Sequence, residues 1–179
     1  GSATNDGGAG IAAALGMRLL DEAGREIEPT CAGLEHLKQI DDREMRSLLK
    51  QCSFMIACDV KNPLCGSNGA SAVYGPQKGA DTAMVWKMDE ILRHYGKILE
   101  ETSGKAITSL EGSGAAGGAA LPLLAFADAK LCSGIDVVLD AIAFDQQLET
   151  VDWVFSGEGK IEAQTSFGKA IAGVAKRAE

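Results

Sequence analysis

Apolar residues recur at intervals of three and four along residues 82–99, and this spacing predicts the longest helix of the chain. The residues that share the apolar face are Met84, Val85, Met88, Ile91, Leu92, Tyr95 and Leu99. Shorter helices are expected at 9–20, 41–50, 119–126, 135–142 and 166–177. In the third of these, Pro122 falls in the first turn, where proline is tolerated.

A short apolar run at 52–59 predicts a buried strand, and a second run at 151–155 predicts another strand. A hairpin is expected over residues 21–30, with its turn at 21–24. Strand, loop and helix follow one another in that order, which is typical of α/β proteins. We therefore expect an α/β fold with a mixed or parallel sheet flanked by helices.

Composition excludes several classes of protein. Hydrophobic residues make up 46% of the 179, which is enough for a packed core. No apolar run approaches the length of a membrane span, and the net charge of −8 argues against binding to a nucleic-acid backbone. Five cysteines without a C-x-x-C pair, and two histidines, give no zinc spacing, so we expect reduced thiols in a cytoplasmic protein.

The 22 glycines are concentrated in four segments, 1–10, 66–79, 112–118 and 157–173. Glycine costs backbone entropy on folding, so such clusters mark special dihedrals or a close approach of the backbone to a ligand or to another segment. The first cluster enters a predicted helix and can present free amide groups to an anion. It matches neither the Walker loop nor the dinucleotide fingerprint, and a tight turn is the alternative interpretation.

Polar residues beside these clusters supply candidate chemistry. Asp59 follows a predicted strand and could bind magnesium or take a proton, or it could simply cap the next turn. The segments 66–70 and 75–79 combine amides with Lys78, which suits an oxyanion, although a solvated loop has the same composition. The small residues at 112–118 permit close approach of a ligand or of a packed helix. Glu158 is flanked by glycines, which is hard to explain by packing.

Taken together, these segments resemble the bacterial glycerate kinase family, type I. The matching stretches are GSATNDGGAG at 1–10, ACDVKNPLCGSNGASAVYGPQKGA at 57–80, GSGAAGG at 112–118 and SGEGKIEAQTSFGKA at 156–170. Glu162, Ala163 and Ile171 depart from the family pattern, which has Asp, Gly and Pro there.

The resemblance implies a two-domain α/β kinase about twice as long as this chain, with further segments before and after it. Residues 1–150 would be the inserted second domain. Residues 151–179 would begin the returning C-terminal part of the first, Rossmann-like domain.

The resemblance also implies ATP and Mg²⁺ as cofactors and glycerate as the small-molecule substrate. The expected catalytic residues are Asp59, Glu158 and Lys169. The expected metal ligands are Asp6, Asp59 and Glu158. Binding of phosphate, carboxylate or substrate hydroxyl groups is expected from Ser2, Thr4, Asn5, Gly7, Gly8, Asn62, Asn68, Gln77, Lys78 and Gln164.

Two alternatives remain open at this point. The chain could be a folded module that is inactive without further segments, or part of a kinase for another small hydroxy acid. No nucleic-acid or membrane partner is expected. Exposure of surface that the rest of such a kinase would cover predicts self-association into a homo-oligomer.

Overall fold

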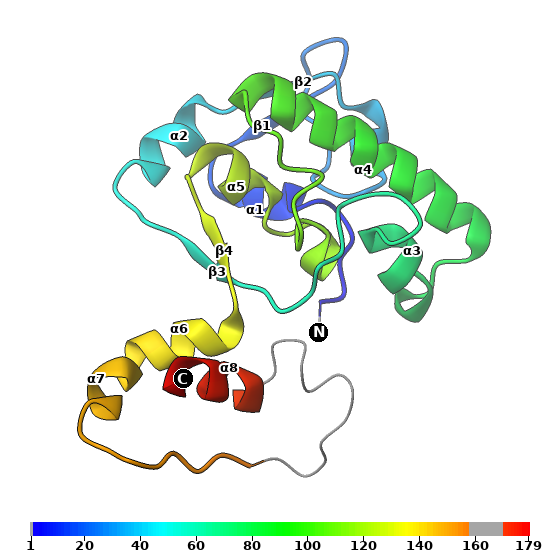
Figure 1. Cartoon of the computed structure of the whole chain (residues 1–179). Coiled ribbons are helices and arrows are strands. Elements are labelled where there is room, and N and C mark those ends of the chain that lie inside the picture. Colours follow the sequence, from blue (N-terminus) through cyan, green and yellow to red (C-terminus); the bar gives the residue numbers. More distant parts are fainter. Residues whose placement is uncertain (1, 158–169) are drawn as a thin grey trace. The chain divides into compact units, whose positions relative to one another are not determined.

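The computed structural model describes residues 2–157 and 170–179 and shows a mixed α/β fold, as predicted. The helices in Figure 1 are α1 (Ala9–Ala14), α2 (Arg43–Leu49), α3 (Ala70–Tyr74), α4 (Thr82–Ser103), α5 (Leu121–Phe126), α6 (Gly134–Ala141), α7 (Phe144–Leu148) and α8 (Ala170–Ala178). Three short 3-10 helices are η1 (Gly33–His36), η2 (Pro76–Lys78) and η3 (Ala115–Gly117). The strands are β1 (Arg18–Leu20), β2 (Gln39–Asp41), β3 (Met55–Ala57) and β4 (Lys130–Cys132).

The chain divides into two compact units. Unit 1 comprises Gly1–Ile56 and Val60–Lys130, and unit 2 comprises Ala57–Asp59 and Leu131–Glu179. The domain boundary expected near residue 150 thus falls inside unit 2. None of the helices in the described part of the chain is both long and apolar enough to cross a membrane.

Helix α4 is the longest element, as the apolar spacing predicted. It begins after Asp81, whose carboxylate accepts a hydrogen bond from the Met84 amide (2.8 Å), and it ends at Gly104, which has φ 72°. Its apolar face packs against α3 and α5. The side chains buried on it include Leu92, Tyr95 and Leu99, which are fully buried in the core of unit 1.

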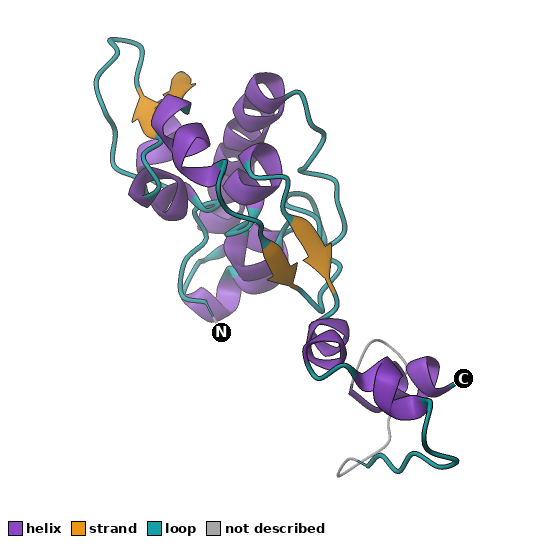
Figure 2. Ribbon diagram, turned by 90° about the vertical axis from the view of Figure 1, so that its left-hand side faces the viewer, coloured by secondary structure: helices purple, strands orange, loops and turns teal. Residues whose placement is uncertain are grey.

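The strands form two separate pairs (Figure 2). β1 and β2 are antiparallel, and the chain after β1 turns back so that Leu20 bridges Glu26, which confirms the predicted hairpin. β3 pairs with β4: the Lys130 amide donates to the Phe54 carbonyl, and the Cys58 amide to the Cys132 carbonyl. From the first of these hydrogen bonds to the second, the residue numbers increase on both strands, so the two strands run parallel.

Three predicted elements need correction. The helix expected at 9–20 ends at Ala14, because Gly16 takes φ 93° and the chain then enters β1. The run at 52–59 does contain a strand, but β3 is not buried, since Met55 is 65% exposed. The strand expected at 151–155 does not form: the described structure gives these residues no strand partner, and Phe155 is 93% exposed.

Candidate active site

Three of the four glycine-rich segments, 1–10, 66–79 and 112–118, meet within unit 1. The Gly7 amide donates to the Gly117 carbonyl (2.9 Å), which joins the first segment to the third. The Gly114 amide donates to the Asn62 carbonyl (2.9 Å), which joins the third segment to the loop after β3. Residues more than a hundred positions apart are therefore held side by side.

Glycine is required where these segments touch. A Cβ atom on Gly117 would lie 2.4 Å from the Thr4 carbonyl oxygen, and one on Gly8 would lie 2.6 Å from the Ala119 carbonyl oxygen. Both glycines also have positive φ. At these two positions glycine allows one backbone segment to pack directly on another. This is one of the two roles expected for the glycine clusters, the other being close approach to a ligand.

Lys78 lies where the first segment meets the end of η2. Its ammonium donates to the Thr4 carbonyl (2.5 Å) and to the Ser2 hydroxyl (3.1 Å), both of which are neutral. The described residues place no carboxylate in an ion pair with it. Burial lowers the pKa of Lys78 below its ordinary value, while the charge of Asp6 opposes that shift. Lys78 is thus a cation held by neutral groups and able to attract an anion.

Asn5 is buried beside this lysine contact, with 7% of its surface exposed. Its side-chain amide donates to the Ser71 hydroxyl (2.9 Å), which ties the first segment to α3. Its carbonyl oxygen Oδ1 has no hydrogen-bond partner among the described residues. A buried acceptor of this kind is costly unless a donor reaches it.

Asn62 uses its side chain to shape its own loop. Its Nδ2 donates to the Asn68 carbonyl (2.8 Å), and its Oδ1 accepts from the Tyr74 hydroxyl (2.6 Å). The Asn68 side chain is left exposed, as is that of Gln77 on η2. Of the amides expected to bind substrate, Asn68 and Gln77 are therefore accessible, whereas both ends of the Asn62 amide are occupied.

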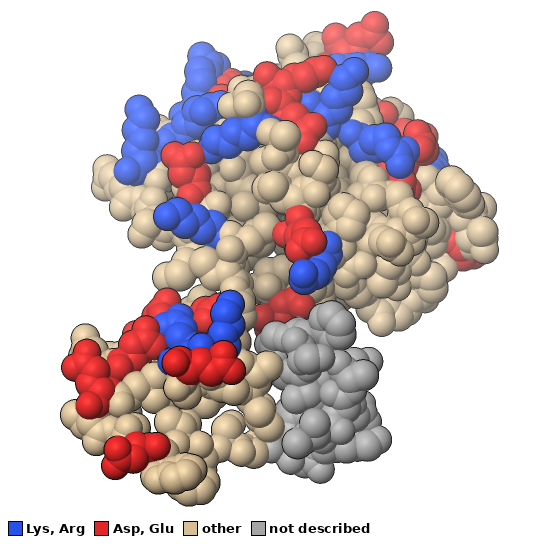
Figure 3. All heavy atoms as spheres, in the orientation of Figure 1, with Lys and Arg blue, Asp and Glu red and all other residues tan. Residues whose placement is uncertain are grey.

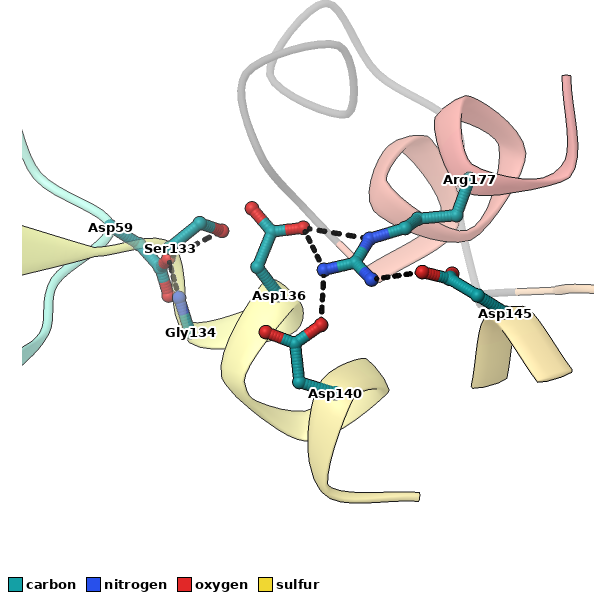
Figure 4. A network of polar contacts seen from close by, with 7 residues as sticks. All are labelled: Asp59, Ser133, Gly134, Asp136, Asp140, Asp145 and Arg177. Atoms are coloured by element: carbon teal, nitrogen blue, oxygen red, sulfur yellow. Dashed lines mark hydrogen bonds and ion pairs between the residues drawn. The ribbon is translucent and has the colours of Figure 1, made fainter. Parts of the chain in front are cut away.

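The two described aspartates of the predicted site both accept backbone N–H groups at helix starts. Asp6 accepts from Gly8 (3.1 Å) and Gly10 (3.2 Å) at the beginning of α1. Asp59 accepts from Gly134 (2.7 Å) at the beginning of α6, as Figure 4 shows. Asp59 therefore acts as a cap, which was the alternative to a metal or catalytic role. It caps α6, however, and not the turn that directly follows it in the chain. Asp6 belongs to unit 1 and Asp59 to unit 2.

Sequence reasoning missed Asp89. Asp89 is only 6% exposed. Its Oδ1 accepts a hydrogen bond from the Gly66 amide (2.9 Å), and its Oδ2 forms an ion pair with Arg93 (2.6 Å). One signal could have revealed it: Asp89 is spaced four residues from Val85 and three from Leu92, so it falls on the predicted apolar face. A carboxylate at such a position needs partners.

Comparison with known proteins identifies the family. The sequence matches the model of the glycerate kinase family over residues 1–179. The chain belongs to the glycerate kinase family. It is 48% identical to a glycerate kinase of Halalkalibacterium halodurans and 43% identical to the glycerate 2-kinase of Escherichia coli, in each case over 100% of this chain and 47% of the relative.

A solved structure agrees with this assignment. A crystal structure from Salmonella typhimurium LT2, described as that of a glycerate kinase 2, superposes with a TM-score of 0.89 at 46% identity. It is matched by 99% of this chain, which covers 48% of that chain. The chain thus spans about half the length of the glycerate kinases it matches.

Membership of the glycerate kinase family implies a nucleotide and a metal ion, and the side chains that could hold the metal are considered first. Within residues 2–157 and 170–179, no group of three or more His, Cys, Asp or Glu side chains gathers that could hold a metal ion by itself. Mg²⁺ in nucleotide sites usually keeps several waters and takes one or two carboxylates besides phosphate. Asp6 fits such a single-carboxylate contact, because each of its oxygens accepts only one protein hydrogen bond. The predicted residues Glu158, Gln164 and Lys169 lie outside the described residues.

Proposed function

We propose that this chain forms part of a kinase that transfers the γ-phosphoryl group of ATP to glycerate. The observation that carries the proposal is the Lys78 site, where a partly buried cation lies at the meeting point of glycine-rich segments and its hydrogen bonds within the described residues go to neutral groups. Family membership and the names of the relatives support glycerate as the acceptor.

Phosphoryl transfer depends on alignment and charge neutralisation more than on covalent chemistry by the protein. In this proposal Lys78 pairs with the glycerate carboxylate or with a phosphate, and Asn5 ties the segment that contacts Lys78 to α3 through Ser71. Ser2, Thr4, Gly7 and Gly8 shape the same segment. Asn68 and Gln77 offer exposed amides, while Asn62 holds the loop.

The remaining predicted roles complete the proposal. Asp59, Glu158 and Lys169 act on the reacting groups, and Gln164 binds substrate. The metal contacts come from Asp6, Asp59 or Glu158. When bound, Mg²⁺ supplies positive charge to the phosphates of ATP. We place the protein in the cytoplasm, where its five cysteines would stay reduced.

The test is an assay of glycerate-dependent ADP formation by the protein that contains this chain, or by the chain joined to the flanking segments of the H. halodurans relative. Lys78→Met keeps the length of the side chain and removes its charge. We expect the KM for glycerate or for ATP to rise at least about tenfold, and the substrate affected identifies the bound anion. Lys61→Met is the matched control, since Lys61 pairs at the surface with Glu111 (3.3 Å).

A panel of small hydroxy acids in the same assay separates the alternatives. Turnover with another acid and none with glycerate would show that the other acid is the acceptor. The panel can discriminate between acids because a pocket that hydrogen-bonds a hydroxyl group strongly rejects analogues without it. Absence of turnover with every acid would remove the kinase proposal. Assay of the isolated chain then shows whether it is active by itself or only as part of the longer protein.

A further inference from the structure

A short exposed loop, residues 66–68, projects from the segment after β3, and we call it the tip loop. The Gly69 amide donates to the Gly66 carbonyl (2.9 Å), which closes a tight turn across it. Ser67 and Asn68 at its centre are exposed. The side chain of Asn62 reaches the Asn68 carbonyl from the preceding residues. This bond fixes the second half of the tip loop.

The first half of the tip loop is fixed from α4. The buried Asp89 accepts the Gly66 amide on one carboxylate oxygen (2.9 Å) and the Arg93 guanidinium on the other (2.6 Å). The Asp89 backbone carbonyl also accepts from the Cys65 thiol (3.5 Å). Asp89 therefore contacts two successive residues at the base of the loop, 23 and 24 positions away in the sequence.

The charge of Asp89 gives this contact its strength. A hydrogen bond to an ionised acceptor is roughly twice as strong as a neutral one, and burial increases it further. Arg93 offsets the cost of burying the carboxylate and holds its orientation. Because α4 is anchored in the core through Leu92 and Tyr95, the base of the tip loop takes its position from a helix that is itself fixed in the core of unit 1.

We propose that Asp89 is a positioning residue that holds the tip loop in place, and with it Asn68, which the kinase proposal assigns to substrate binding. The inference rests on the proposed kinase function, and Asp89 itself acts only through Gly66 and Cys65. Loss of its carboxylate frees the Gly66 amide. Gly66 has φ 96°, and a Cβ atom there would meet no described atom within 4 Å, so close packing does not hold this residue in place. Misplacement of such a loop by an ångström is enough to weaken substrate alignment.

The experiment compares Asp89→Ala, Asp89→Asn and Glu90→Ala in the protein that contains this chain. Glu90 is the matched control, because it pairs with the same Arg93 and its side chain is 68% exposed, but it does not contact the loop. Hydrogen exchange at the Gly66 amide and the kinetic constants for glycerate and ATP are measured for each variant. Thermal melting shows that each variant is folded.

We expect Asp89→Ala to raise exchange at Gly66 and to raise one KM, each at least about tenfold, with a smaller change in kcat. Asp89→Asn keeps an acceptor for Gly66 and should recover part of both effects, so it decides the matter if the alanine variant does not fold. Glu90→Ala should resemble the unsubstituted protein in both measurements.

The outcomes separate this inference from the kinase proposal. Unchanged exchange at Gly66 in the Asp89 variants overturns the positioning role, whatever the activity. Increased exchange with both KM values unchanged also overturns it, because the loop would then move without affecting substrate. If the unsubstituted protein phosphorylates no hydroxy acid, the proposed function fails and the role of the loop in substrate binding falls with it.

Discussion

Glu100 concentrates three hydrogen bonds on one carboxylate oxygen near the end of α4. Its Oε1 accepts from the Ile107 amide (2.8 Å), the Thr108 amide (2.9 Å) and the Thr108 hydroxyl (2.9 Å). Burial raises the pKa of Glu100, but these hydrogen bonds outweigh burial, so its pKa lies below the ordinary value of 4.5. The carboxylate thus fastens the segment after α4 to the helix.

Because the folded-state pKa of Glu100 is lowered, its ionised form contributes stability above the unfolded-state value, and that contribution is lost as pH falls through the folded-state pKa. We predict that Glu100→Gln lowers the free energy of unfolding at pH 7 by about 1–2 kcal/mol. The difference from the unsubstituted chain should shrink as pH falls below 4.5. Urea unfolding at a series of pH values measures it.

Glu101→Gln is the control for this prediction, since Glu101 is exposed and forms a surface ion pair with Lys97 (3.7 Å). Such pairs contribute little. A Glu100 variant whose deficit is the same at every pH, or no larger than that of the Glu101 variant, contradicts the assigned role.

For individual residues, the sequence could indicate which side chains belong to the site but not which groups they contact. Lys78 and Asn5 were predicted because they lie in glycine-rich segments, and the structure places both at the junction of those segments. Asn62 was expected to bind substrate because it lies in the stretch 57–80 that resembles the family, yet its amide is occupied within its own loop. Asp89 was missed because its partner Gly66 is distant in sequence, and only its position on an apolar face hinted at burial.

At the scale of elements, α4 and the segment after it approach closely at Gly96. A Cβ atom on Gly96 would lie 2.4 Å from Cγ2 of Thr108 and 3.1 Å from Cδ2 of Leu64. The Thr108 side chain cannot simply rotate away, because its hydroxyl is held by Glu100. The absence of a side chain at Gly96 therefore sets the distance between the two elements.

We predict that Gly96→Ala destabilises the chain, although alanine favours a helix over glycine by about 1 kcal/mol. Overpacking at a site without room costs about 1–3 kcal/mol, and here it exceeds the gain in helix propensity. Chemical denaturation measures the change in the free energy of unfolding.

A second substitution tests the cause. Thr108→Ser removes Cγ2 and keeps the hydroxyl that Glu100 binds, so in this background Gly96→Ala should become neutral or stabilising. Equal effects of Gly96→Ala in both backgrounds would mean that contact with Thr108 does not determine the packing.

Elements were predictable where local signals agreed. Apolar spacing indicated α4, and the helix is there; Asp81 at its start and Gly104 at its end are local signals that agree with it. The run at 151–155 has the composition of a strand, but a strand also needs a neighbour with which to pair, and composition does not supply one. The helix expected at 9–20 begins where predicted but ends early for a local reason, since Gly16 was not recognised as a stop signal.

At the scale of the whole molecule, the surface combines interspersed charges with exposed apolar groups. On the face of unit 1 shown in Figure 3, basic and acidic side chains alternate without a single dominant sign. In unit 2, by contrast, Arg177 binds Asp136, Asp140 and Asp145 at once (Figure 4), which joins α8 to α6 and α7. The same unit exposes Trp153 by 79% and Phe155 by 93%.

Exposed aromatic side chains in one short segment favour association, because burying them removes apolar surface from water. We predict that the isolated chain self-associates through residues 151–155, with a second copy as the partner. Substituting Trp153→Ser and Phe155→Ser together should shift light-scattering masses toward the monomer across a concentration series. Trp86→Ser is the control, because Trp86 is also exposed (69%) but lies on α4 in unit 1. A monomeric mass for the unsubstituted chain at high concentration, or an equal shift in the Trp86 variant, would contradict association through this segment.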